Sequence, residues 1–137
     1  MQEITNLTQY STVIAGSAIQ AGKWLPEAMS FIKTHQDELK YRHFAVFLVC
    51  MTLAMPKGNS YRGTVSSWLQ PVRDIATPVS EGLFAGTLDI NRIASLRDKL
   101  KFRLSVLFGV WKEGDHRDWN LIKNWAEDLK ALLDSTK

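Results

Sequence analysis

The apolar residues of the C-terminal third recur at steps of three and four, the spacing that places them on one side of an α-helix. Asp89 precedes the first series, and Asp115 or Asp118 the second, and aspartate is a good helix-capping residue. A short turn at Gly114 separates the expected helices, residues 90–112 and 118–134, so we expect an antiparallel helix pair. The apolar positions are Ile90, Ile93, Leu96, Leu100, Leu104, Leu107 and Trp111, then Trp119, Ile122, Trp125, Ala126, Leu129, Leu132 and Leu133.

The remainder of the chain also favours helix over strand. Apolar residues in residues 4–22 fit one face of a first helix, and Pro26 is well placed to begin a second, short one. A third helix is expected over about residues 37–55, because its second half is apolar on all sides. The prediction is an all-α fold: a single helical bundle of about five helices over residues 1–137, with helix in well over half of the residues and no sheet.

Composition is that of one folded domain. The chain has 137 residues, of which 45% are hydrophobic, and this length is enough to bury a core. Cys50 is the only cysteine and lies in an apolar run, so no internal disulfide can form and a reducing compartment is favoured. That run, residues 44–55, is too short to cross a bilayer. We therefore expect a cytoplasmic protein with no membrane partner.

Catalytic motifs are not found. The segment from Gly16 to Trp24 resembles a phosphate-binding loop, but its glycine spacing is wrong and Trp24 stands where Ser or Thr would hold magnesium. The histidines, His35, His43 and His116, lack the three- or four-residue spacing of a helical metal site. No nucleophile pattern is present. We expect no catalytic residue, no metal and no cofactor, and hence no enzyme.

One long stretch of the chain is free of acids. Residues 39–73 contain no Asp or Glu, and such unopposed positive charge attracts polyanions, above all a phosphate backbone. A plainer explanation is that the apolar run within this stretch excludes charge of either sign. The net charge is only +3, which gives weak support to a nucleic-acid partner. The predicted phosphate contacts in this stretch are Lys40, Arg42, Lys57, Arg62 and Arg73.

The expected helix over residues 90–112 carries a basic stripe. At about 100° per residue, Arg92, Lys99 and Arg103 fall within about 40° of one another. A stripe of this kind can follow a nucleic-acid backbone without reading its bases, although a solvated helix face would look the same. Trp24 and Trp68, which lie near loops and basic residues, are candidates for stacking on bases.

The same expected helix is apolar on a second side. Phe102, Val106 and Val110 fall largely outside its main apolar stripe. Either this helix is central in the bundle, or these residues form a protein interface. The uncharged segment over residues 4–22 permits the same two explanations. We expect docking into a larger assembly, with further copies of the chain among the partners.

A small, mildly basic, all-helical chain without catalytic motifs resembles the small subunit of CRISPR effector complexes of the Cascade type. The resemblance rests on the general character of the whole chain. It implies an antiviral defence complex in which copies of a helical bundle stack side by side. Each copy would hold the target or displaced strand, DNA or RNA, through phosphate contacts and cleave nothing. The alternative is a helical protein-binding module: an immunity protein, an inhibitor or an assembly adaptor.

Overall fold

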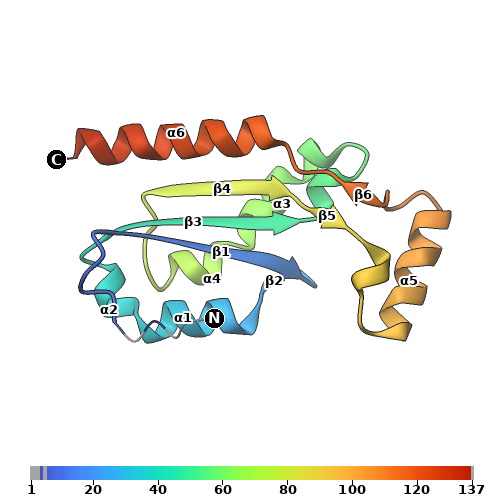
Figure 1. The fold of residues 1–137 in the computed structure, drawn as a ribbon, viewed down its shortest axis with the longest axis horizontal. Helices are drawn as coiled ribbons and strands as arrows, with labels where there is room; N and C mark the ends of the chain where they lie inside the picture. The colour runs from blue at the N-terminus through green and yellow to red at the C-terminus, as the bar shows by residue number, and fades with distance from the viewer. Residues whose placement is uncertain (1–3, 5, 137) are drawn as a thin grey trace.

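The computed structural model describes residue 4 and residues 6–136, and its centre is a β-sheet (Figure 1). The sheet has the strand order β2-β1-β3-β4, with β1 at Thr12–Gln20, β2 at Lys23–Trp24, β3 at His43–Cys50 and β4 at Ser80–Ala85. Strands β1, β3 and β4 run parallel, whereas β2 returns antiparallel to the end of β1. The all-α prediction is wrong, since 47% of the chain is helical and 22% is strand.

Short helices connect the parallel strands. Helices α1 (Pro26–Thr34) and α2 (Gln36–Leu39) lead from β2 to β3. Between β3 and β4 the chain forms η1 (Thr52–Ala54), η2 (Gly58–Tyr61), α3 (Arg62–Ser67) and α4 (Gln70–Arg73). Because parallel strands need crossover connections of one hand, both sets of helices lie on the same face of the sheet. Figure 1 shows α1, α2 and α4 below the strands, and their buried side chains Ile32, Leu39 and Val72 belong to one core with Phe44 and Leu48 of β3.

Two segments expected as helices contain the central strands. Residues 12–20 form β1, and residues 43–50 form β3 within the range expected as the third helix. Strand β3 pairs on both sides, with Val46 opposite Ala15 on β1 and opposite Glu81 on β4. A parallel strand buried on both faces is apolar without alternation, so over a short run it has the same pattern as a buried helix. Its content of Phe and Val favours the strand.

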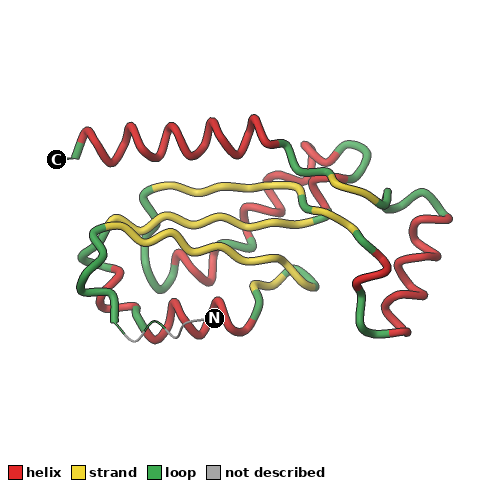
Figure 2. Tube along the Cα trace, in the orientation of Figure 1, coloured by secondary structure: helices red, strands yellow, loops and turns green. Residues whose placement is uncertain are grey.

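The last helix packs on the other face of the sheet, over β3 and β4. Helix α6 (Trp119–Ser135) crosses above β4 as one continuous helix (Figures 1 and 2). Its Trp125 packs edge-on against Phe84 with ring centroids 5.6 Å apart, and against Phe47 at 6.0 Å. The indole Nε1–H of Trp125 donates to Ser80 Oγ at 2.9 Å. The prediction of this helix over residues 118–134 is confirmed to within one residue.

The expected antiparallel helix pair is wrong. Helix α5 (Leu96–Leu107) lies beyond the end of the sheet, while α6 lies along its face (Figure 1). Before α5 come β5 (Thr87–Leu88) and η3 (Ile90–Arg92), and after it comes β6 (Gly114–Asp115), which pairs with β5. This small two-stranded sheet separates the helices, because it holds both ends of the α5 segment near the end of β4. Ser95, not Asp89, caps α5, and Asp89 caps η3 instead.

No helix within the described residues is both long and apolar enough to cross a membrane.

Candidate functional site at the carboxyl edge of the sheet

The three parallel strands end at the same edge of the sheet. Strand β1 ends at Gln20, β3 at Cys50 and β4 at Ala85, and α5 stands opposite this edge (Figure 1). In open α/β sheets, ligands bind outside the carboxyl ends of the strands, where the loops can be shaped without disturbing the core. A ligand site is therefore expected at this edge.

A tight turn closes the β1–β2 hairpin at this edge. Ala21 and Gly22 have φ angles of 50° and 73°, both in the left-handed region, as a two-residue hairpin turn requires. A Cβ added to Gly22 would lie 3.3 Å from Nε1 of Trp68, so the indole packs directly against the turn. The turn is thus fixed on one side by an aromatic ring.

A cavity of about 290 Å³ opens between this turn, the end of β3 and α5. Two wider hollows, of about 730 and 480 Å³, adjoin it along α5, and Trp111 lines all three. Phe102 of α5 faces Trp111 with ring centroids 6.5 Å apart. The cavity is lined by Ile19, Gln20, Ala21, Gly22, Cys50, Met51, Thr52, Trp68, Leu88, Phe102 and Trp111.

The chemistry of this cavity is that of a binding site for a flat, largely apolar group. Three aromatic residues line it: Trp68, Phe102 and Trp111. Its other polar side chains are uncharged: Gln20, Thr52 and the thiol of Cys50. Burial raises the pKa of the Cys50 thiol, so it stays protonated at neutral pH and is a poor nucleophile. Among the described residues, no three His, Cys, Asp or Glu side chains are grouped to hold a metal ion.

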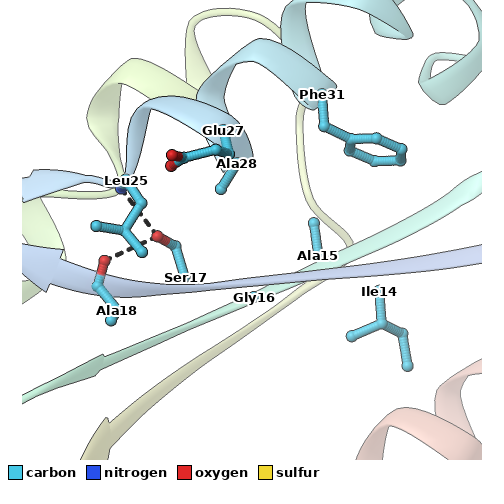
Figure 3. A pocket seen from close by; sticks show the side chains of 9 residues that line it. All are labelled: Ile14, Ala15, Gly16, Ser17, Ala18, Leu25, Glu27, Ala28 and Phe31. Carbon is cyan, nitrogen blue, oxygen red and sulfur yellow. Dashed lines mark hydrogen bonds between the residues drawn. The ribbon is translucent and has the colours of Figure 1, made fainter. Parts of the chain in front are cut away.

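A second hollow, of about 360 Å³, follows the open edge of β1 (Figure 3). From Thr12 to Ala18, no described strand pairs with this edge, because β2 reaches only Ile19 and Gln20. Ser17 Oγ accepts from the Leu25 N–H at 3.0 Å and donates to the Ala18 carbonyl at 2.8 Å. Of the described residues that line the hollow, Glu27 alone has an ionisable side chain. It is an apolar groove beside an unpaired strand and has no catalytic constellation.

The cations predicted to contact phosphates are scattered over the molecule. Four of them are held by neighbours. Lys40 pairs with Asp37 at 2.9 Å, and Arg92 lies 3.3 Å from Asp89. The guanidinium of Arg42 donates to the Leu7 and Glu38 carbonyls, and that of Arg73 donates to both carboxylate oxygens of Glu81 and to Ser66 Oγ.

The predicted basic stripe does not form on one helix. Arg92 belongs to η3, and the extended residues 93–95 separate it from Lys99 and Arg103 on α5. Lys57 lies in the turn before η2 with a φ of 63°, and Arg62 begins α3. Both therefore lie outside the helix that carries Lys99 and Arg103.

The two predicted stacking residues have different places. Trp24 is buried in β2 with 5% of its surface exposed, and its Nε1 has no hydrogen-bond partner among the described residues. Trp68 lines the cavity at the carboxyl edge. The predicted interface residues Phe102 and Val106 are half-buried and face the hollows, whereas Val110 is 43% exposed. The cavity thus brings together Trp68 and Phe102, which the sequence placed in separate surfaces.

Sequence reasoning missed the remaining cavity residues. The turn at Ala21–Gly22 and the end of β3 at Met51 and Thr52 become site residues only when β1 and β3 are parallel neighbours. The available signal was Gly22 after an uncharged run, which fits a strand ending in a hairpin turn as well as a helix stop. Gly16 lies inside β1 and not in a loop, so residues 16–24 form no phosphate-binding loop.

Comparison with known proteins agrees with this architecture. The sequence profile of the flavodoxin domain family matches residues 1–113. The comparison with curated proteins gives no match. The predicted function as a nucleic-acid-binding CRISPR subunit is contradicted, because that prediction required an all-α bundle and the match and the sheet indicate a flavodoxin-like α/β protein. With its profile match over most of the chain and its parallel sheet, the chain belongs to the flavodoxin domain family.

Proposed function

We propose that the cavity at the carboxyl edge binds the ring system of a flavin and that the chain serves in electron transfer. The observation that carries this proposal is the aromatic cavity between the ends of β1 and β3, in a chain of the flavodoxin domain family. In the flavodoxin-like strand order, the flavin lies at the carboxyl ends of the strands near the reversal of strand order. The cavity occupies a corresponding edge.

The ring system suits the residues present. A flavin ring is flat, with apolar faces and with nitrogen and oxygen atoms along its rim. Trp68, Phe102 and Trp111 offer aromatic surface for the faces. The backbone of the Ala21–Gly22 turn and the side chain of Thr52 supply polar groups at the border of the cavity. The donor set therefore fits the ring half of the cofactor.

The phosphate half has no matching cradle in the described residues. A phosphate is usually held by backbone N–H groups of a glycine-rich loop that joins a strand to a helix N-terminus. In residues 12–136 the links that follow β1, β3 and β4 are a hairpin, a 3₁₀ segment and a short strand, none of this kind. The flavodoxin-like order 2-1-3-4-5 contains five parallel strands. Strands β1, β3 and β4 follow one another along the chain and lie side by side, as do strands 3, 4 and 5 of that order. The open edge of β1 lies where the first strand of that order stands.

The chain's own contribution is to hold and shield the ring. A bound flavin supplies one- and two-electron transfer. The aromatic walls hold the ring plane and exclude water from its faces, and the turn at Gly22 limits its position on one side. Cys50, protonated at neutral pH, adds no charge to the cavity. The prediction that the chain is not itself an enzyme stays a prediction.

Binding of flavins to the purified chain tests this function. We expect the chain to bind riboflavin and FMN and to quench the fluorescence of both. The two dissociation constants should lie within about threefold of each other, because no described loop would bind the phosphate of FMN. Trp111→Ala should weaken binding about tenfold, since it removes a stacking surface. Trp119→Ala is the matched control, because Trp119 is 53% exposed and lies outside the cavity.

Two outcomes would contradict the proposal. One is the absence of quenching by either flavin under conditions in which circular dichroism shows the chain folded. The other is equal weakening by the Trp111 and Trp119 substitutions, which would place the flavin elsewhere.

A further inference from the structure

Helix α5 presents its leucines to solvent. Leu96, Leu100, Leu104 and Leu107 are exposed by 82, 61, 46 and 78%, and Phe108 at the helix end is 77% exposed. The helix has no buried residue. A twelve-residue helix in water is marginal without tertiary packing of an apolar face, and exposed apolar patches of this kind usually meet a partner. The leucine face of α5, defined by these four leucines, therefore needs an explanation.

The leucine face points away from the rest of the molecule. Phe102, Ser105 and Val106 line the hollows at the carboxyl edge. At about 100° per residue, the four leucines span about 80° and lie about 160° around the helix from those three residues. Figure 1 shows α5 standing beyond the end of the sheet, so its outer side is not covered by α6 or by the short helices. The helix is attached by one side and free on the other.

Cations border the leucine face on both sides. Arg97 and Lys101 follow the leucines on one flank, and Lys99 and Arg103 on the other, each within about 105° of the centre of the face. Asp98 is the only acid in α5, and it lies 4.0 Å from Lys101 on the inner side. An apolar face between two basic flanks is the pattern of helices that lie in a membrane interface.

We propose that α5 docks the protein on the surface of an anionic phospholipid bilayer. The leucine face enters the boundary between headgroups and acyl chains, and the four flanking cations contact lipid phosphates. A helix of twelve residues is about 18 Å long, so it lies in the plane of the surface and does not span the bilayer. The expectation of no membrane partner rested on the apolar run of residues 44–55 being too short to cross a bilayer, and that argument does not bear on a helix that lies in the surface.

A second copy of the chain is a poorer occupant of the same face. Two copies joined through their leucine faces would bring four cations of each helix beside four cations of the other, with one acid apiece to offset them. A lipid surface rich in phosphates offers the opposite charge at the same depth. Charge complementarity thus selects the membrane.

Vesicle flotation of the full chain tests the proposal. We expect binding to vesicles that contain phosphatidylglycerol, little binding to vesicles of phosphatidylcholine alone, and weaker binding as salt increases. The double variant Leu100→Gln, Leu107→Gln should lower the partition coefficient about 100-fold, because two large apolar side chains no longer leave water. Leu121→Gln with Leu132→Gln on α6 is the matched control, since each of these leucines is 40% exposed, and it should bind like the parent.

A charge variant separates the electrostatic contribution to vesicle binding from the apolar one. Arg97→Gln with Lys101→Gln should reduce binding to anionic vesicles and flatten its salt dependence. The substituted leucines face solvent, so the far-ultraviolet circular dichroism of the leucine variant should match that of the parent and show that α5 remains folded. The proposal does not depend on flavin binding, and the two can fail separately.

Three results would overturn the membrane proposal. The first is that the parent binds no vesicle, the second that the α5 leucine variant binds as well as the parent. The third is that sedimentation shows a dimer that only the α5 leucine variant converts to monomer. That last result would assign the leucine face to a second copy.

Discussion

Helices α5 and α6 carry similar apolar patterns but have different surroundings. Helix α6 lies on the sheet, with Leu129 only 3% exposed and Trp125 hydrogen-bonded to Ser80. Helix α5 has no buried residue, and its Leu96 and Leu107 are 82 and 78% exposed. A stripe of apolar residues at helical spacing therefore predicts the helix and its apolar side, but it does not predict what covers that side. In α6 the sheet covers it, and in α5 nothing in the described chain does so.

The largest expected difference between the helices is in the cost of losing a leucine. Leu129→Ala should lower the free energy of unfolding by about 3 kcal/mol, because it leaves a cavity against the sheet. Leu100→Ala, at a side chain that is 61% exposed, should change it by less than about 0.5 kcal/mol. Chemical denaturation followed by circular dichroism measures both. Equal losses of unfolding free energy in the two variants would mean that the leucine face of α5 is packed in solution, as the apolar side of α6 is.

Removing the helix caps should have a smaller effect of the same kind. Asp118 accepts from the N–H groups of Asn120 and Leu121 at 3.0 Å, and Asp118→Ala should cost about 1 kcal/mol of global stability. Ser95 accepts from the Asp98 N–H at 3.3 Å. Ser95→Ala should leave global unfolding nearly unchanged, because α5 can fray without opening the core.

Amide hydrogen exchange distinguishes these two cap variants. The Ser95 variant should speed exchange in the first turns of α5 alone, whereas the Asp118 variant should speed it throughout α6. If loss of the Ser95 cap lowered the unfolding midpoint as much as loss of the Asp118 cap, α5 would be an integral part of the cooperative unit.

The smallest expected effect concerns the segment that joins the two helices. Hydrogen bonds from the Arg117 guanidinium and backbone N–H hold the pKa of Asp115 well below its usual range, and Thr87 Oγ1 donates a further bond across β5 and β6. A lowered carboxyl pKa stabilises the fold above the pKa of the unfolded chain, and this contribution is lost as pH falls through the folded pKa. Stability from this group should therefore be constant from neutrality to about pH 4 and decline below.

Carboxyl chemical shifts of Asp115 measured against pH test this expectation. The midpoint should lie below that of an ordinary aspartate, and Arg117→Gln should move it upward, because the hydrogen bonds from the charged guanidinium are lost. A midpoint that does not respond to Arg117→Gln would show that the link between the helices is not held by this ion pair.

The sequence alone located several elements correctly. Pro26 begins α1 as predicted, and α6 occupies its predicted range, because a fixed φ and a long period of three and four are local properties. The strands were missed for a physical reason. Residues 12–20 and 43–50 are short and apolar, and whether such a run extends into a sheet or coils into a helix depends on neighbours that are distant in sequence.

In the candidate site too, individual residues could be named from the sequence, but their grouping could not. The sequence named Trp68 and Phe102 but gave them separate roles, since they are 34 positions apart and nothing local brings them together. The parallel pairing of β1 with β3 creates the edge at which the Gly22 turn, Trp68 and α5 converge.

What the sequence determined by itself is the set of local features: where α1 and α6 begin, the left-handed capacity of Gly22, and the apolar stripe of α5. The tertiary structure alone decided that Phe102 and Val106 face the molecule while the leucines of α5 face solvent. Both sides of that helix are apolar, so burial of either would remove a similar area from water. The short β5–β6 pair, which holds the two ends of the segment, fixes which side turns inward.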